Sequence, residues 1–149
     1  MDRSFTGDND IQRERLRTLI AGSNDEELSK LMPAGWTVAA VLAHMAFWDA
    51  RALYLMDKWS SGIPPSAADY EPEDIDWAND AGKPLCLALP PRDAARLALR
   101  LAEETDSRVA AMSDEMLLSI LDAGTPFNLS RAAHRSEHLD DIETILRQS

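Results

Sequence analysis

Cysteine, histidine and basic side chains are all scarce in this chain, and each scarcity argues against a class of protein. Cys86 is the one cysteine, so no intramolecular disulfide can form and a cytoplasmic location is predicted. Lys and Arg total 15 against 26 Asp and Glu, which gives a formal net charge of −11 at pH 7. Such a surface repels phosphate backbones and anionic lipid, so neither nucleic acid nor membrane is an expected partner.

Long apolar runs and a leader-like start are missing as well. The longest uninterrupted apolar stretch of the most apolar segment is 38–43, far short of the roughly 20 residues that span a bilayer. Residues 1–10 have neither a basic nor an apolar region. We expect one domain, residues 1–149, that buries about two thirds of its unfolded surface and needs neither a metal nor a disulfide for stability. Any metal would then be functional rather than structural.

Apolar side chains recur with the helical period, and no strand-like alternation competes with them. The predicted long helices cover about 8–21, 37–60, 91–112 and 125–147, with short capped segments at 23–32 and 113–121. Thr125 is the expected N-cap of the last helix, with Pro126 at its first position.

Residues 61–90, rich in glycine and proline, are predicted to form a long irregular connection of the kind that covers a ligand. Their acidic run, 69–80, lacks EF-hand spacing and is interpreted as a solvated loop. The predicted fold is all-α, a four-helix bundle with a long crossover loop between its second and third long helices.

The three histidines form the most informative pattern. His134 and His138 lie one turn apart, where side chains share a helix face about 6 Å apart, and His44 lies in the most apolar helix. The residues on the same helix face as each histidine are apolar. They are Ile142 and Ile145 beyond His138, and aliphatic and aromatic neighbours one turn from His44, namely Ala40, Val41, Phe47 and Trp48. All three should therefore point inward. A transition metal would satisfy three buried neutral imidazoles at once and keep a position open for water or substrate.

A second interpretation stays open at this point. Paired histidines four residues apart also occur at interfaces, and a lone core histidine often hydrogen-bonds a backbone carbonyl. The chain would then be a non-catalytic helical bundle that binds a small apolar ligand or a protein partner, with structural histidines.

Three segments resemble the signatures of DinB/YfiT-like bundle proteins. Residues 35–49 resemble their "W-s-v-x-x-v-l-x-H-l-a-x-w" motif, 74–79 resemble the "D-x-D-x-x-N" before the third helix, and 134–138 resemble the "H-x-x-E-H" of the fourth. Order and spacing are kept over nearly the whole chain. The resemblance implies a DinB/YfiT-type four-helix bundle, often a homodimer, in which His44, His134 and His138 hold a divalent metal, usually nickel, zinc or iron.

The same resemblance implies a function. The family includes bacillithiol- and mycothiol-dependent transferases and a mycothiol-dependent maleylpyruvate isomerase domain. The chain is therefore expected to be a metal-dependent enzyme, a hydrolase or a thiol S-transferase, that acts on a small molecule, with a low-molecular-weight thiol as a candidate cofactor. The sequence shows no obvious basic cluster for the carboxylates of such a thiol.

Two acidic residues flank the histidine pair on the last helix. Asp141 is either a further ligand, a partner of a ligand, or simply solvated, while Glu137 lies about 100° around from His138 and suits an outward salt bridge. Asp49 and Arg51 either meet the substrate or form a surface pair.

Among the remaining candidates, the tryptophans carry the clearest expectations. All four are most simply interpreted as core and loop anchors. Trp36 and Trp48 lie on either side of His44 and are also candidate walls of a pocket, whereas Trp59 and Trp77 look exposed and favour a dimer. Cys86 has apolar neighbours and is interpreted as a small buried hydrophobe.

Overall fold

The computed structural model describes residues 1–69 and 74–148, and within these residues the predicted all-α class is confirmed. In chain order the helices are α1 (Ser4–Ala21), α2 (Asp25–Leu28), α3 (Val38–Ser60), α4 (Asp74–Ala88), α5 (Pro91–Ala110), α6 (Asp114–Asp122) and α7 (Ala132–Arg147). Short 3-10 turns lie at Pro33–Gly35 and Ala67–Asp69. In the described part, β pairing is limited to one isolated bridge between Leu31 and Thr37.

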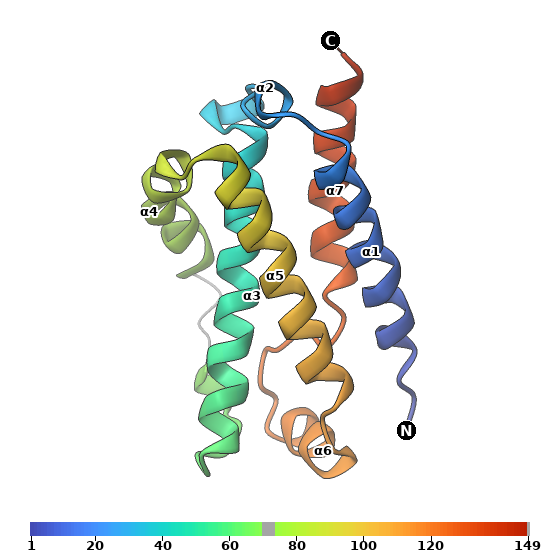
Figure 1. Ribbon diagram of the computed structural model, residues 1–149. Coiled ribbons are helices and arrows are strands. Elements are labelled where there is room, and N and C mark those ends of the chain that lie inside the picture. The colour runs from blue at the N-terminus through green and yellow to red at the C-terminus, as the bar shows by residue number, and fades with distance from the viewer. Residues whose placement is uncertain (70–73, 149) are drawn as a thin grey trace.

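The four long helices α1, α3, α5 and α7 lie side by side (Figure 1). Helix α5 contacts α3 and α1, and α7 contacts the same two helices. In the view of Figure 1, α1 and α7 run upward while α3 and α5 run downward. Helix α4 rises on the left, outer side of α3. The chain thus returns from the lower end of α3 to the upper end of α5 by way of α4.

Helix α3 is the central element. By length and composition it is the one described helix that could cross a membrane, with a hydropathy of 1.2 over its most apolar window, but 67% of that window is buried inside the protein. Its start agrees with the sequence prediction, because the Thr37 hydroxyl accepts the backbone N–H of Ala40 at 3.0 Å. Such burial is typical of a core helix.

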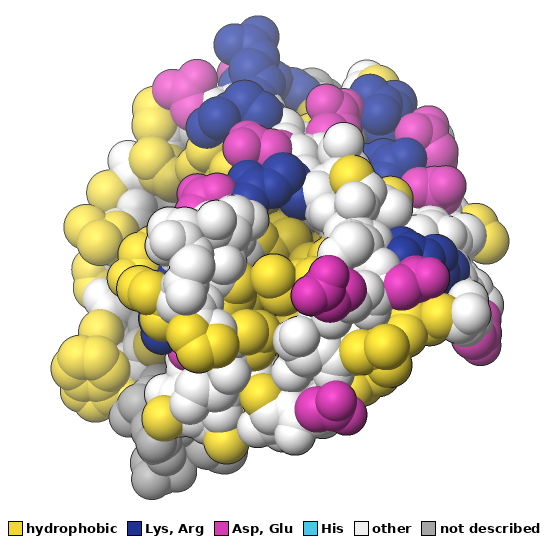
Figure 2. Space-filling model, turned by 90° about the horizontal axis from the view of Figure 1, so that it is seen from below, with side chains coloured by type: hydrophobic (Ala, Val, Ile, Leu, Met, Phe, Trp, Pro, Cys, Tyr) yellow, Lys and Arg dark blue, Asp and Glu magenta, His cyan; other side chains and the backbone are white. Residues whose placement is uncertain are grey.

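Two hydrophobic clusters fill the interior. The larger one packs Leu42 of α3 against Leu16 of α1 and Leu139 of α7. The smaller one, around Trp59 and Val109, closes the lower end. Seen from below, hydrophobic side chains also occupy the centre and left of the surface, while charged side chains gather along its upper edge (Figure 2).

The prediction of an irregular 61–90 segment was wrong over 74–88, because α4 occupies Asp74–Ala88 and contains Pro84, whereas residues 61–66 are irregular as predicted. Proline and glycine disfavour a helix locally, but contacts with other parts of the chain outweigh that preference here. The Asn79 side chain accepts a hydrogen bond from Trp48 of α3 at 2.9 Å, and Lys83 donates to the Ala34 carbonyl. These contacts hold α4 against the upper half of α3.

The solvated-loop interpretation of the acidic run was also wrong at its first residue. Asp69 has 1% of its side chain exposed and accepts hydrogen bonds from Lys58 Nζ at 2.6 Å and Trp59 Nε1 at 3.1 Å. Glu71 and Glu73, which belong to the same run, lie outside the described residues.

Helix α7 begins at Ala132 and not near Thr125 as predicted. Residues 123–131 form a loop that is anchored by Phe127, whose ring packs edge-on against Trp59 with centroids 5.1 Å apart. Asn9 of α1 also fixes the loop, since its side chain accepts the backbone N–H of Arg131 at 2.7 Å. Long-range contacts therefore decide where α7 starts. The predicted turn at 113–121 is the complete helix α6, capped by Ser113.

Candidate metal centre

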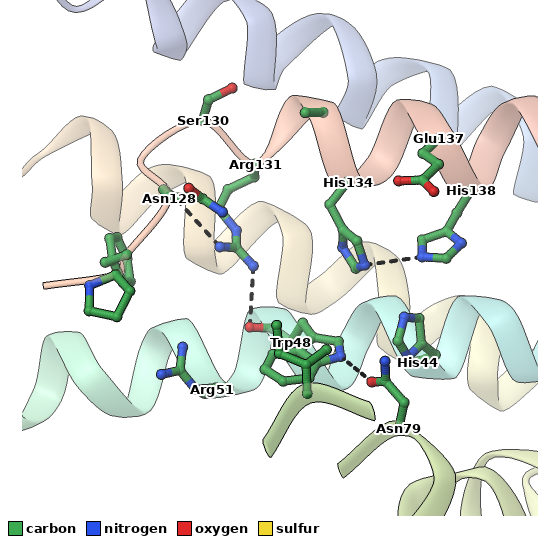
Figure 3. A pocket seen from close by; sticks show the side chains of 14 residues that line it. His44, Trp48, Arg51, Asn79, Asn128, Ser130, Arg131, His134, Glu137 and His138 are labelled. Atoms are coloured by element: carbon green, nitrogen blue, oxygen red, sulfur yellow. Dashed lines mark hydrogen bonds between the residues drawn. The ribbon is translucent and has the colours of Figure 1, made fainter. Parts of the chain in front are cut away.

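Helices α3 and α7 bring the three histidines to one place (Figure 3). His44 is only 9% exposed, and His134 and His138 are partly buried on the facing side of α7. One ring nitrogen from each residue lies within 4.8 Å of the other two. The inward rows expected from the sequence thus do meet. That these residues bind a metal stays a prediction.

The ring geometry fits a shared ion. The Nε2 atoms of His134 and His138 are 3.0 Å apart, which is about the separation of two nitrogens that bind one ion at 2.0–2.2 Å with an angle near 90°. The His44 ring centroid lies 4.9 Å from that of His138 and 5.4 Å from that of His134. The nitrogens therefore lie around a common point between the two helices.

Burial keeps these histidines neutral. It lowers the pKa of His44 to about 4, with a smaller effect from His138. It also lowers the pKa of His134 to about 3, followed by repulsion from the other two histidines and from Arg131 and Arg135. The pKa of His138 is lowered by burial, which nearby carboxylates partly oppose. Neutral imidazoles are the form that binds a metal.

The histidines have few partners of their own. Among the described residues, the ring nitrogens of His44 make no hydrogen bond, and the single hydrogen bond of His134 and His138 joins the two rings to each other. The ring nitrogens without a hydrogen bond are not fully buried, because the buried side-chain atoms without a partner in the described residues are Thr125 Oγ1 and Arg135 Nε. The donor set, its charge and its missing partners all fit a divalent transition metal.

Two cavities reach this histidine cluster from different sides. The arginine cavity, about 700 Å³, is lined mainly by His44, Trp48, Arg51, Asn79, Arg131, His134, Glu137 and His138. The acidic cavity, about 760 Å³, is lined mainly by Trp36, His44, Asp76, Asn79, Asp80, His138 and Asp141. Trp48 and Trp36 each line one cavity, so their predicted role as pocket walls is confirmed. The Trp36 ring meets His44 edge-on, with centroids 5.7 Å apart.

Asp49 does not form the surface pair that the sequence left open. Its side chain is buried and accepts hydrogen bonds from Arg131 Nε at 3.1 Å and Arg135 Nη2 at 3.3 Å. Arg135 is 1% exposed and also binds both carboxylate oxygens of Asp106, at 2.7 and 2.8 Å. Burial raises the pKa of Asp49, and the two arginines oppose that rise. We call these residues, together with Arg13, which donates to Asp106 at 2.8 Å, the ion cluster.

Basic residues do lie beside the histidines, contrary to the sequence expectation. Arg131 directly precedes α7, and Arg135 lies between His134 and His138 in it. The two arginines are four residues apart, like the two histidines, and this repeated interval was the available signal. Arg51 lines the arginine cavity, donates to the Asp69 carbonyl at 3.0 Å and lies over the Trp48 ring at 5.8 Å. The sequence did not show that α3 and α7 would bring these arginines to one cavity.

Glu137 and Asp141 are exposed and do not belong to the cluster of converging nitrogens. Glu137 lies at the arginine cavity and Asp141 at the acidic one, and both raise the pKa of His138. Within the described residues Glu137 makes no ion pair. Cys86 is half-buried against the core, and burial raises the pKa of its thiol, as expected for a small hydrophobe.

Comparisons with curated proteins and with solved structures returned no match. The family profile of the DinB superfamily matches residues 9–138, which include all three histidines and both cavity-lining tryptophans. Because the match covers most of the chain, this protein belongs to the DinB superfamily.

Proposed function

We propose that this protein is a metal-dependent enzyme whose divalent ion is held by His44, His134 and His138. The observation that carries the proposal is the convergence of three neutral imidazoles where two cavities meet. We interpret α1, α3, α5 and α7 as the four-helix bundle that carries this site, with the connection through α4 as its crossover. Nickel, zinc and iron all suit imidazole ligands.

Three histidine ligands would leave room for a reactant at the ion. The bound ion would supply Lewis acidity and lower the pKa of a water or thiol. The chain's own residues shape the surroundings of the ion, because Trp48 lines the arginine cavity and Trp36 lines the acidic cavity. Each cavity is of the size that holds a small molecule. The substrate is accordingly proposed to be a small molecule and not a polymer.

The reaction is proposed to be thiol S-transfer or hydrolysis. Arg131 and Arg51 at the arginine cavity support the transferase, because a low-molecular-weight thiol that carries carboxylates would find guanidinium groups there. Hydrolysis needs only water at the same ion. The two reactions differ in whether an added thiol is consumed.

One observation favours the non-catalytic alternative. The hydrogen bond between His134 and His138 satisfies two ring nitrogens without an ion. The cavities would then bind a small apolar ligand, and the histidines would be polar groups in their walls.

A homodimer is the proposed assembly. Trp77 and Leu85 are each 74% exposed and lie eight residues apart on the outward face of α4. Trp59 does not contribute, because it is 3% exposed and belongs to the smaller core cluster, contrary to its exposed appearance in the sequence. Sedimentation at micromolar concentration should give twice the chain mass of 16.5 kDa. A monomer would contradict this proposal, and the cytoplasmic location stays a prediction.

Metal content tests the proposed function. Protein purified from metal-replete medium should contain one divalent ion per chain by elemental analysis, whereas its absence would favour the non-catalytic binder. The loaded protein should then be screened with low-molecular-weight thiols and electrophiles, with thiol consumption as the readout. Consumption would assign S-transfer, and turnover without a thiol would assign hydrolysis.

A further inference from the structure

Asn79 of α4 lies between the two cavities and lines both of them. Its side chain meets Trp48 Nε1 at 2.9 Å. An indole N–H only donates, so the Asn79 atom that it contacts must be the oxygen. The amide NH₂ group must then face away from the indole. Figure 3 shows this nitrogen directed toward His44 and the histidine cluster.

The orientation of this amide therefore follows from the chemistry of its partner. Trp48 is a positioning residue in this arrangement, because a hydrogen-bond acceptor in its place would favour the flipped amide. The result is a fixed N–H donor beside three nitrogens that converge on one point. Such a donor suits a ligand oxygen bound at that point.

The charge of the surroundings favours an anion. Three neutral imidazoles leave the charge of a divalent ion uncompensated. The adjoining ion cluster contains three guanidinium groups, from Arg13, Arg131 and Arg135, against the carboxylates of Asp49 and Asp106. The carboxylates that oppose this field are Asp10, which pairs with Arg13 at 3.0 Å, Glu137 at the arginine cavity, and Asp76, Asp80 and Asp141 at the acidic cavity. All five are exposed, so solvent screens their charges.

We propose that Asn79 is a substrate-binding residue whose amide donates a hydrogen bond to a carboxylate oxygen of the substrate at the histidine centre. The substrate class is then a small carboxylic acid, with one oxygen toward the ion and one toward Asn79. This inference rests on the proposed metal-dependent function. It names the chemical group of the substrate, a carboxylate, and it assigns a role to Asn79 of α4, a helix that supplies none of the three histidines.

The test uses the full-length protein loaded with cobalt(II), whose visible spectrum reports a new ligand on the metal. Acetate and imidazole are titrated in parallel, because acetate accepts a hydrogen bond from Asn79 whereas the free N–H of a bound imidazole cannot. Asn79→Leu should weaken acetate about tenfold, the worth of one charge-assisted hydrogen bond. Its imidazole affinity should change less than about twofold.

Two further variants complete the design. Trp48→Phe keeps an aromatic ring but removes the N–H that orients the amide, so acetate should weaken by a smaller factor, about two- to fivefold. Gln12→Leu removes an amide from α1, away from both cavities, and should leave both affinities unchanged. Thermal unfolding of each loaded variant checks that α4 remains folded against α3.

The outcomes distinguish failure of the Asn79 inference from failure of the proposed metal-dependent function. An unchanged ratio of acetate to imidazole affinity in both the Asn79 and Trp48 variants would overturn the inference while the metal site stands. An equal loss of both probes would also overturn it, because Asn79 would then support the metal site and not the substrate. Failure of the wild-type protein to bind cobalt(II) would overturn the proposed function, and the inference with it.

Discussion

Helices α3 and α7 share two buried polar clusters, and the chain treats them in opposite ways. The ion cluster is charged, and its carboxylates and guanidinium groups pair with one another across α1, α3, α5 and α7. The histidine cluster is neutral, and within the described residues its only hydrogen bond is internal. The fold supplies both carboxylate partners of the first cluster, and of its buried atoms in the described residues Arg135 Nε alone has no hydrogen bond. The second has the chemistry of a site that an external ligand completes.

The comparison also explains why function is assigned to the histidines and not to the arginines. A buried charged group is tolerated when its partners are present, so the ion cluster needs no ligand to account for it. Three imidazole nitrogens that lie within 4.8 Å of one another have no such charged partners. The following four experiments probe this difference, from the largest expected effect to the smallest.

Breaking the ion cluster should cost stability and leave metal binding intact. Asp106→Ala leaves the guanidinium groups of Arg13 and Arg135 without their shared partner, so the free energy of unfolding should fall by about 3–5 kcal/mol in urea titrations. Asp57→Ala is the matched control, because Asp57 pairs with Arg108 at a surface where its side chain is 68% exposed. That change should cost at most about 1 kcal/mol. Equal losses of unfolding free energy in the two variants would show that the ion cluster contributes no more than a surface ion pair.

Breaking the histidine cluster should have the reverse effect. His138→Ala leaves two ligands, so affinity for the metal should fall at least about a hundredfold in competition with a chelator. The far-ultraviolet circular dichroism should remain that of the wild type, because a chain of 149 residues does not need a metal to build its core. Full metal content in the variant would refute the site. Loss of helix together with metal would show that the ion is structural.

Acid should destabilise the metal-free protein through the histidines. The pKa of His134 is about 3 in the folded protein against about 6.5 when unfolded. Between these values only the unfolded chain takes up the proton, so stability falls as pH drops, by up to about 1.4 kcal/mol per pH unit for each such histidine. His134→Ala should flatten the plot of unfolding free energy against pH between 4 and 6.5. An unchanged slope would contradict the burial of a neutral imidazole.

The smallest effect is expected at Glu137. Its charge raises the pKa of His138, but the side chain is exposed and lies outside the nitrogen cluster. Glu137→Gln should therefore change metal affinity by less than about threefold in the same chelator competition. A tenfold loss would make Glu137 a ligand and enlarge the site beyond the histidines.

The sequence by itself determined the cores of the four long helices and the direction of the histidines. The hydrophobic period predicts a helix over 37–60, and α3 spans Val38–Ser60. The interval of four between His134 and His138, on a row that continues into isoleucine, predicts a shared inward face. These are local properties, set within a few turns of one helix, so a linear pattern is sufficient to find them.

Tertiary structure alone decided what surrounds the histidines. Asp49 and Arg135 are 86 residues apart in the chain, and Trp48 and Asn79 are 31 apart, so no local pattern announces either contact. The same reason explains the missed α4, which forms despite Pro84, and the late start of α7. Local preferences differ by a few kcal/mol at most, and burial against another helix is large enough to reverse them. The sequence thus placed the candidate metal ligands, and the packing of α4 and α7 against α3 built the cavities around them.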